Sequence, residues 1–200
     1  MHVIEAIEKR RSVKYFDPKY RINNEDVQRL LKLTRLSPTA FNLQHWRFVL
    51  INDPALRASI RANAWDQPQM TDASVLVAIC GNLNAWRDDA SQYWAHAPQA
   101  VRQMMTASID EYYRDRQSVQ RDEVMRSCGL AAQTLMLAAT SMGYDSCPLD
   151  GFDFEAVGRL INLPDDHLMS MFVAIGKSSS EPWPRGSLLG TELTVLVDRF

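Results

Sequence analysis

The sequence predicts an α+β fold in which helices cover both faces of a small sheet. The stretch from Ala73 to Gly81 is a near-continuous apolar run rich in β-branched residues, which is typical of a central strand covered on both sides. From Arg121 to Met142 the pattern is helical and apolar almost all round, which predicts a buried helix. No internal repeat, low-complexity tract or linker interrupts the chain, so we expect one domain over residues 1–200.

The N-terminal elements are predicted from apolar spacing and capping residues. Apolar residues within 3–7 fit a short helix, and the basic residues 9–11 close it where the helix dipole favours positive charge. NNED then opens a second helix, with Asn23 or Asn24 as its cap, and Ser37-Pro38 ends it.

The middle of the chain alternates strand and helix signals. WRFVLIN at 46–52 is strand-like, and Asp53-Pro54 caps a helix that runs to about Asn63. After the central strand, Pro98 to Arg116 has a helical and moderately polar pattern.

The C-terminal third is predicted to complete the sheet. Gly143 ends the long apolar helix, and short strands follow at Asp145 to Pro148 and at Met169 to Gly176. A helix from Asp153 to Ile161 separates them, and TELTVLVDRF at 191–200 is expected to add a last edge strand.

Composition argues against several classes of function. A net charge of −2 and a pI of about 6.1 give no general attraction to nucleic acid. No stretch reaches the roughly 18 apolar residues that a membrane span needs, and MHVIEAIEKRR lacks the apolar core of a leader peptide. We therefore expect no membrane association and a cytoplasmic location.

The familiar short motifs of other sites are missing from the sequence. The cysteines, Cys80, Cys128 and Cys147, are odd in number and form no CxxC pair, which predicts reduced core thiols rather than disulfides or structural zinc. The four histidines are scattered without an HExxH pattern, so we expect no metal site. No GxGxxG follows a strand, and GKSSS at Gly176 lacks the upstream glycine of a phosphate loop.

The segment RRSVKYF, residues 10–16, predicts an anion site if it is extended. Period two then places Arg10, Ser12 and Lys14 on one face, with about 7 Å between alternate side chains and about 13 Å from end to end. These dimensions suit a ligand with a phosphate at one end and an electron-rich ring at the other. The alternative is that the basic residues 9–11 only complement the carboxyl end of the first helix.

Two loops are also candidates for ligand contact. SPTAFNLQHWRF, residues 37–48, combines aromatic and amide side chains without a helical or strand period. In CPLDGFD, residues 147–153, Pro148 and Gly151 force a turn that could bring backbone N–H groups against a flat ligand. Taken separately, each is equally consistent with an ordinary connection.

In order, these stretches resemble the nitroreductase family of FMN-dependent oxidoreductases. The resemblance is carried by RRSVKYF, SPTAFNLQHW, MTDASVLVAICG, GYDSCPLDGFD and the terminal EPWPRGSL, and it covers essentially the whole chain. It implies a nitroreductase-like three-layer α/β/α fold with a small mixed sheet, in a domain-intertwined homodimer. It also implies electron transfer from NAD(P)H through FMN to a nitroaromatic or quinone in a ping-pong cycle. NLQHW and WPR are most similar to a bacterial subgroup of NAD(P)H nitroreductases or quinone-responsive reductases.

The resemblance also implies which residues contact the cofactor. Arg10, Arg11 and Ser12 correspond to the FMN phosphate and ribityl end, and Lys14 to the flavin N1 and O2 edge. Arg185 corresponds to a C-terminal arginine that clasps the same phosphate. The full implied set is Arg10, Arg11, Ser12, Lys14, Pro38, Thr39, Ala40, Asn42, Gln67, Gln69, Pro148, Leu149, Asp150, Gly151 and Arg185.

Within this set, the resemblance implies a loop that the partner subunit supplies to the flavin, and this loop corresponds to Pro38, Thr39, Ala40 and Asn42. Asp150 and Gly151 occupy the turn whose amides face flavin N5 and O4, where other members often carry glutamate. Gln67 and Gln69 fall where an amide or basic side chain touches the ring or ribityl, in place of the asparagine and lysine of some members. The apolar helix from Arg121 to Met142 would form the core of the dimer.

Such a site needs no acid or base from the protein, because the cofactor carries the hydride. We therefore expect no catalytic side chain, with Lys14 as electrostatic support, and small aromatic substrates besides the nicotinamide. Five aromatic residues are candidates for the substrate mouth or for core packing: Trp65, Trp86, Trp94, Tyr112 and Tyr113. Two other functions stay open, namely a flavin-binding store or regulator without turnover and a structural dimer without cofactor.

Overall fold

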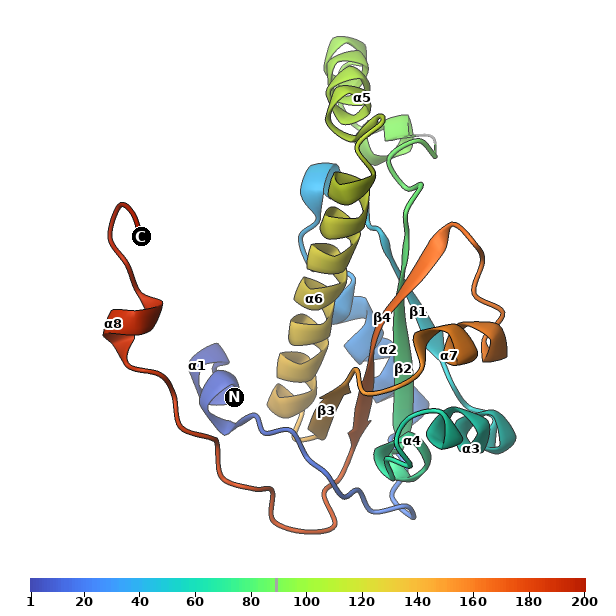
Figure 1. Ribbon diagram of the computed structural model, residues 1–200, viewed down its shortest axis with the longest axis vertical. Helices are drawn as coiled ribbons and strands as arrows, with labels where there is room; N and C mark the ends of the chain where they lie inside the picture. The colour runs from blue at the N-terminus through green and yellow to red at the C-terminus, as the bar shows by residue number, and fades with distance from the viewer. Residues whose placement is uncertain (89) are drawn as a thin grey trace.

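The computed structural model describes residues 1–88 and 90–200, which form a four-stranded sheet in the order β1-β2-β4-β3 (Figure 1). Its strands are β1 (Trp46–Leu50), β2 (Val75–Asn82), β3 (Asp145–Leu149) and β4 (His167–Gly176). The apolar run of β2 is an interior strand, as predicted, and all eight of its residues are buried.

The expectation of a mixed sheet is wrong for these four strands, because every neighbouring pair is antiparallel. β2 and β3 run in the same direction, but β4 is inserted between them, so they form no parallel pair. The parallel pairing found at this sheet is an isolated bridge between Ser12 and Ser146 at the outer edge of β3.

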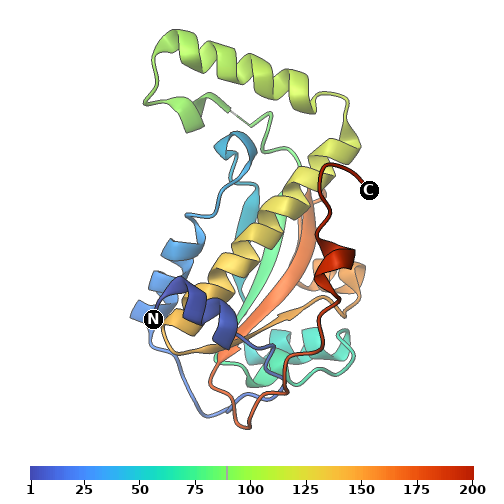
Figure 2. The same ribbon diagram turned by 90° about the vertical axis from the view of Figure 1, so that its left-hand side faces the viewer.

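Helices cover both faces of the sheet and give the three layers that the sequence predicts (Figures 1 and 2). On one face lie α2 (Asn24–Thr34) and α6 (Gln117–Ser141), with α1 (Val3–Lys9) packed against α6. On the other face lie α3 (Pro54–Ala62), α4 (Gln69–Asp72) and α7 (Phe154–Leu160).

The two cores follow from the alternation of side chains along β2. Leu76 and Ala78 belong to the hydrophobic cluster of α3, α4 and α7, whereas Val75 and Val77 belong to that of α2 and α6. Gly81 allows α6 to approach closely, since a Cβ at this position would lie 2.2 Å from Cγ1 of Val124.

The caps predicted at Asn23 and Asp53 are confirmed, and Asp153, which was predicted as a helix residue, also acts as a cap. Asn23 Oδ1 accepts from Asp26 N at 2.8 Å, Asp53 Oδ1 from Ala55 N at 3.0 Å, and Asp153 Oδ1 from Ala156 N at 2.9 Å. The long helix α6 ends before Gly143, whose φ of 81° is the left-handed conformation expected of a helix stop. It begins at Gln117, four residues earlier than its apolar pattern indicates, because its first turn is polar.

A third cluster lies beyond the end of the sheet. It joins η1 (Ala40–Asn42), η2 (Ala90–Trp94) and α5 (Gln99–Tyr113), which stand at the top of Figure 1. The short helices η1, η2 and α4 were not predicted, since one turn is too short to show a helical period.

The expected C-terminal edge strand is wrong. Thr191–Thr194 forms the short helix α8, and the residues after it join no strand. All residues from 183 to 200 are exposed, and the tail runs outside the body of the chain (Figures 1 and 2). A strand needs a neighbour for its backbone groups, and the tail meets no free sheet edge of its own chain. None of the described helices is long and apolar enough to cross a membrane.

Candidate functional site

The segment 10–16 runs along the outer edge of β3. Val13 N donates to Ser146 O at 3.1 Å, and Phe16 forms an antiparallel bridge with Ser178. Val13 and Phe16 are buried in the core, whereas Ser12 and Lys14 are exposed. The predicted alternation holds only from Ser12 to Lys14. The chain bends there, Tyr15 is 53% exposed although it should share the buried side of Val13, and the segment forms isolated bridges rather than a regular strand.

Arg10, Lys14 and Gln69 converge on Cys147 in β3. Burial raises the pKa of the Cys147 thiol, and the positive charge of Lys14, the Gln69 side chain and the charge of Arg10 each oppose that rise. Such effects require the groups to lie close together, so the structure gathers residues from three separate stretches of sequence. Cys147 itself is fully buried and protonated, which makes it a packing residue.

Polar atoms without partners collect at this edge. Arg10 Nη1, Gln69 Oε1 and Ser146 Oγ are buried and have no hydrogen-bond partner among the described residues. The backbone N–H groups of Asp150 and Gly151 likewise donate to no described group. Each unsatisfied buried group costs about 1–3 kcal/mol, so a ligand that pairs with them would bind favourably. The arginine, hydroxyl and amide donors fit the phosphate and ring oxygens of a flat ligand, and the Gln69 oxygen can accept from a ligand hydroxyl.

The turn after β3 is held from a second loop. Gln67 Nε2 donates to Gly151 O at 2.9 Å. A Cβ at Gly151 would lie 2.6 Å from the Trp65 ring, so a larger residue here would require this exposed indole to shift. Trp65 and Asp66 have φ values of 51° and 53°, and the ion pair between Arg61 Nε and Asp66 Oδ1, at 2.7 Å, helps to hold that conformation.

Arg11 and Arg185 contact the carboxyl end of α1. Arg11 Nη1 donates to Glu8 O at 2.6 Å and to Arg10 O at 2.9 Å. Arg185 Nη2 donates to Ile7 O at 3.1 Å, to Glu8 O at 3.3 Å and to Arg10 O at 3.1 Å. Arg11 therefore caps the carboxyl end of α1, as the alternative reading of the basic residues 9–11 proposed. Arg185 comes from the far end of the sequence and donates to the backbone of Arg10.

The loop with Pro38, Thr39, Ala40 and Asn42 lies elsewhere. Thr39 Oγ1 accepts from Gln44 N at 3.0 Å, and Asn42 has a φ of 58°. This loop stands at the upper end of α6, whereas the segment 10–16 and β3 lie at the lower end (Figures 1 and 2). A helix of 25 residues is roughly 37 Å long, at about 1.5 Å per residue. One chain therefore does not bring the loop to Arg10 and Lys14.

The remaining expected residues divide between site and core. Leu149 is buried in the sheet core, and Pro148 is half-buried beside it. Trp86 and Tyr113 stack at 6.2 Å between ring centroids in the third cluster, with Tyr112 packed against it, which is core packing. Trp65 is 83% exposed beside Gly151, while Trp94 is half-buried in η2.

Sequence reasoning missed Ser146 and a buried histidine network. Ser146 faces the site because of the register between β3 and the segment 10–16, which no local pattern specifies. His45 Nδ1 lies 3.0 Å from Ser127 Oγ, and its Nε2 lies 3.5 Å from the Tyr113 hydroxyl. A lone histidine at the start of a strand carries no sequence signal for such a network.

Comparison with known proteins decides the family. The model of the nitroreductase family matches residues 7–177. The chain belongs to the nitroreductase family. The chain is 45% identical to protein DrgA of Synechocystis over 181 residues. The match covers 90% of this chain and 86% of DrgA.

Two further relatives are named for a nicotinamide substrate or contain a flavin. The chain is 31% identical to MhqN of Bacillus subtilis, whose name includes NAD(P)H nitroreductase, over 90% of this chain and 91% of that one. A crystal structure from Exiguobacterium sibiricum, of a protein classed as a nitroreductase and in complex with FMN, matches with a TM-score of 0.88 and 26% identity. It covers 96% of each chain.

Proposed function

We propose that this chain is an FMN-dependent oxidoreductase that transfers electrons from NAD(P)H through bound flavin to nitroaromatic or quinone acceptors. The observation that carries the proposal is the cluster of unsatisfied polar groups at the edge of β3. Arg10 Nη1, Gln69 Oε1 and Ser146 Oγ are buried without a partner among the described residues, and the amides of Asp150 and Gly151, which follow β3, donate to no described group. A ligand with the polar groups of FMN satisfies such a cluster, and the FMN-bound relative supports that choice.

Bound FMN would accept a hydride from the nicotinamide and pass two electrons to the acceptor. The residues of the chain then have binding and electrostatic roles. Arg10 and Ser12 would hold the phosphate and ribityl end, with Arg185 braced beside Arg10. Lys14 would place its ammonium near the N1 and O2 edge, and the amides of Asp150 and Gly151 would donate to the opposite edge of the ring.

Gln67 and Gln69 have different tasks in this proposal. Gln67 fixes the turn by donating to the Gly151 carbonyl, so it would position the amides rather than touch the ring. Gln69 is 3% exposed and its Oε1 has no partner among the described residues, so it would be available to the ribityl hydroxyls. No acid or base of the protein is required for hydride transfer.

The active unit in this proposal is a homodimer, in the cytoplasm, with the loop 38–42 completing the partner's site. Two observations support it. The loop and the segment 10–16 lie at opposite ends of α6, so a single chain holds two separate halves (Figure 1). In addition, Val3 and Ile4 on α1 are 69% and 70% exposed, and apolar residues of the C-terminal tail such as Leu188 are equally uncovered. Apolar surface of this extent is usually covered by another chain.

The test begins with the spectrum of the purified protein. An absorbance band near about 450 nm identifies bound flavin, and its absence would leave the structural dimer as the better explanation. Anaerobic addition of NADH or NADPH should bleach the band, and a quinone should restore it. Bleaching without reoxidation, or no bleaching at all, would favour the flavin store or regulator. Parallel double-reciprocal plots with varied donor and acceptor would establish the ping-pong cycle.

A further inference from the structure

The loop 38–42 continues into a stretch of unusual backbone. Phe41, Asn42 and Gln44 have φ values of 52°, 58° and 49°, in the left-handed region that is uncommon for residues other than glycine and asparagine. A backbone of this kind persists only where the surrounding structure imposes it. Contacts from outside the loop must therefore hold these residues in place.

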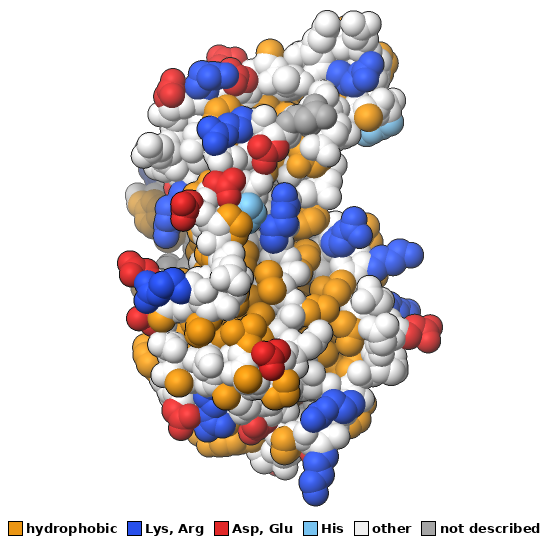
Figure 3. All heavy atoms as spheres, turned by 90° about the vertical axis from the view of Figure 1, so that its right-hand side faces the viewer, with side chains coloured by type: hydrophobic (Ala, Val, Ile, Leu, Met, Phe, Trp, Pro, Cys, Tyr) orange, Lys and Arg blue, Asp and Glu red, His pale blue; other side chains and the backbone are white. Residues whose placement is uncertain are grey.

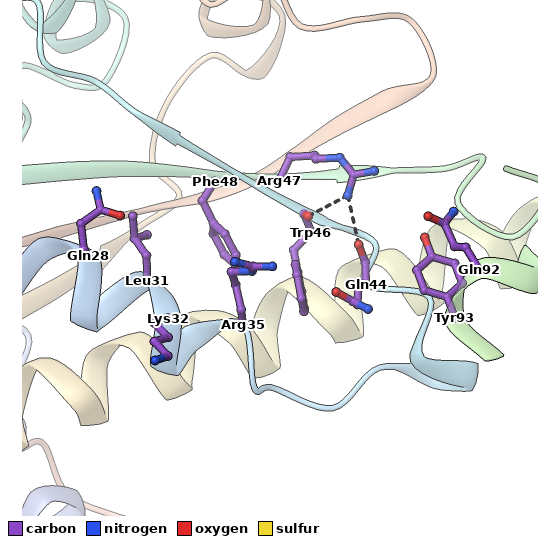
Figure 4. A pocket seen from close by; sticks show the side chains of 10 residues that line it. All are labelled: Gln28, Leu31, Lys32, Arg35, Gln44, Trp46, Arg47, Phe48, Gln92 and Tyr93. Atoms are coloured by element: carbon purple, nitrogen blue, oxygen red, sulfur yellow. Dashed lines mark hydrogen bonds between the residues drawn. The ribbon is translucent and has the colours of Figure 1, made fainter. Parts of the chain in front are cut away.

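The carboxyl-terminal side of this stretch is held by β1. Arg47 Nη1 donates to the carbonyls of Gln44 and Trp46, each at 3.0 Å, as Figure 4 shows. The backbone N–H of Gln44 donates to Thr39 Oγ1 at 3.0 Å and closes the loop on itself. These bonds fix the left-handed residue Gln44, but none of them involves the side chain of Phe41.

Phe41 is held instead by the lobe that contains η2 and α5. Figure 3 shows the surface hollowed between this lobe and the body of the molecule, so few contacts join the two. The Phe41 ring lies 5.8 Å from the Tyr112 ring and 6.3 Å from the Tyr113 ring, measured between centroids. The two tyrosine rings meet edge to face, with centroids 5.0 Å apart. Aromatic contacts of this geometry are favourable, so they restrict the side chain of Phe41 and with it the backbone.

The two tyrosines are anchored in different ways. Tyr113 is fully buried and stacks on Trp86 with centroids 6.2 Å apart, so it belongs to the core of the lobe. Tyr112 is half-buried, and its hydroxyl donates to Glu123 Oε1 of α6 at 3.1 Å. Glu123 is 9% exposed and is also paired with Arg126, which fixes its carboxylate as an acceptor. Tyr112 therefore links α5 to α6 through its hydroxyl and to η1 through its ring.

We infer that Tyr112 is a positioning residue for the flavin site. Its ring holds Phe41, and the backbone of Phe41 sets the direction of Asn42, which is exposed at the tip of the loop. Tyr112 acts through Phe41 and needs no contact with the flavin. The inference rests on the proposed function, under which the loop completes the partner's site. It extends that function to a residue of α5 that is not among the expected cofactor contacts.

The first measurement is amide hydrogen exchange over residues 38–46 of the full-length, flavin-free protein. Exchange reports how often the loop opens, because the N–H groups of Asn42 and Gln44 are bonded to Thr39 within it. Tyr112→Leu should speed this exchange about threefold to tenfold, which corresponds to the loss of one aromatic pair.

Trp86→Leu is the matched control for this measurement. It removes a ring of the same cluster, and no ring contact within the described part of the chain joins Trp86 to Phe41. Exchange over residues 38–46 should therefore stay within about twofold of the wild type in this variant. If Tyr112→Leu melts at a lower temperature than Trp86→Leu, Phe41→Leu takes its place, because it removes the same contact from the loop side.

The second measurement is a fluorescence titration with FMN at one protein concentration. Tyr112→Leu and Phe41→Leu should each weaken FMN binding about threefold to tenfold, because each removes the hold on the loop. The double variant should lose no more than the weaker-binding single variant, since both residues act through one contact. Trp86→Leu should bind FMN within about twofold of the wild type.

The outcomes separate this inference from the proposed function. Unchanged exchange in Tyr112→Leu, equal acceleration in Trp86→Leu, or fully additive losses of FMN affinity would overturn the inference. Faster exchange without any loss of FMN affinity would overturn it as well, because the loop would then not serve the flavin. A protein that binds no FMN would instead overturn the proposed function, while the exchange measurement would still test whether Tyr112 holds the loop.

Discussion

His45 should make the folded protein lose stability in mild acid. Its side chain is 1% exposed, and its two ring nitrogens face Ser127 and Tyr113, neither of which carries a charge. Burial, with a smaller contribution from the positive charge of Arg47, lowers the pKa of His45 from 6.5 to about 4. Between pH 6.5 and about pH 4, the imidazole is therefore neutral in the folded protein but protonated in the unfolded chain.

The sign and size of the effect follow from that difference in pKa. At about pH 7.5 and above, well over the unfolded pKa of 6.5, neither state binds the proton appreciably, and the stabilising contribution of neutral His45 is nearly complete. As the pH falls toward about 4, the unfolded state takes up a proton that the folded state refuses, so the free energy of unfolding decreases by about 1.4 kcal/mol per pH unit. Between about pH 7.5 and about pH 5 the loss is about 2 kcal/mol, and over the whole range it is about 3 kcal/mol.

The assay is urea unfolding of the wild type and of His45→Gln at these two pH values and one protein concentration. Glutamine can still hydrogen-bond Ser127 but does not titrate, so the variant removes only the pH-dependent part of the contribution. Carboxylates elsewhere titrate equally in both proteins and cancel in the comparison. The wild type should lose about 2 kcal/mol more than the variant between the two pH values. Losses that agree within about 0.5 kcal/mol would refute the reasoning.

Three further predictions concern the proposed flavin site. Lys14→Met should lower the two-electron midpoint potential of the bound flavin by roughly 30 to 60 mV, because the ammonium favours the added negative charge, and dye equilibration measures it; a value within about 10 mV of wild type would rule out the role. Arg10→Ala and Arg185→Ala should each weaken FMN binding about tenfold to a hundredfold in a fluorescence titration, and unchanged affinity in both would place the phosphate elsewhere. Gly151→Ala and Trp65→Ala should be non-additive in FMN affinity, by about 0.5 to 3 kcal/mol, because a Cβ at Gly151 meets the indole at 2.6 Å; simple additivity would contradict that contact.

Those parts of the fold that local chemistry determines could be predicted from the sequence. Asn23, Asp53 and Asp153 start helices because each side chain satisfies a backbone N–H within three residues. The strand β2 is recognisable because a strand buried on both faces needs an unbroken apolar run. These signals act over a few residues, so one sequence contains them completely.

The errors occur where conformation depends on distant neighbours. TELTVLVDRF was expected to form an edge strand, yet α8 and the residues after it form none, because the backbone meets no free sheet edge in its own chain. The order of strands was likewise not readable, and the insertion of β4 between β2 and β3 is what makes the sheet antiparallel. The basic residues near position 10 looked alike in the sequence, but Arg11 caps α1, while Arg10 has a buried nitrogen with no partner in the described part of the chain.

The two halves of the proposed site have a thermodynamic consequence that neither half has alone. Arg10 and Lys14 lie at one end of α6 and the loop with Asn42 at the other, so a flavin that contacts both kinds of residue must contact two chains (Figure 1). A ligand that binds the assembled form and not the separate chains stabilises the assembly by mass action. Flavin affinity and dimer affinity are then one linked quantity, and the coupling is reciprocal. The exposed apolar residues of α1 and of the tail would drive association, while the unpaired polar atoms at β3 would add stability to it only once the cofactor is bound.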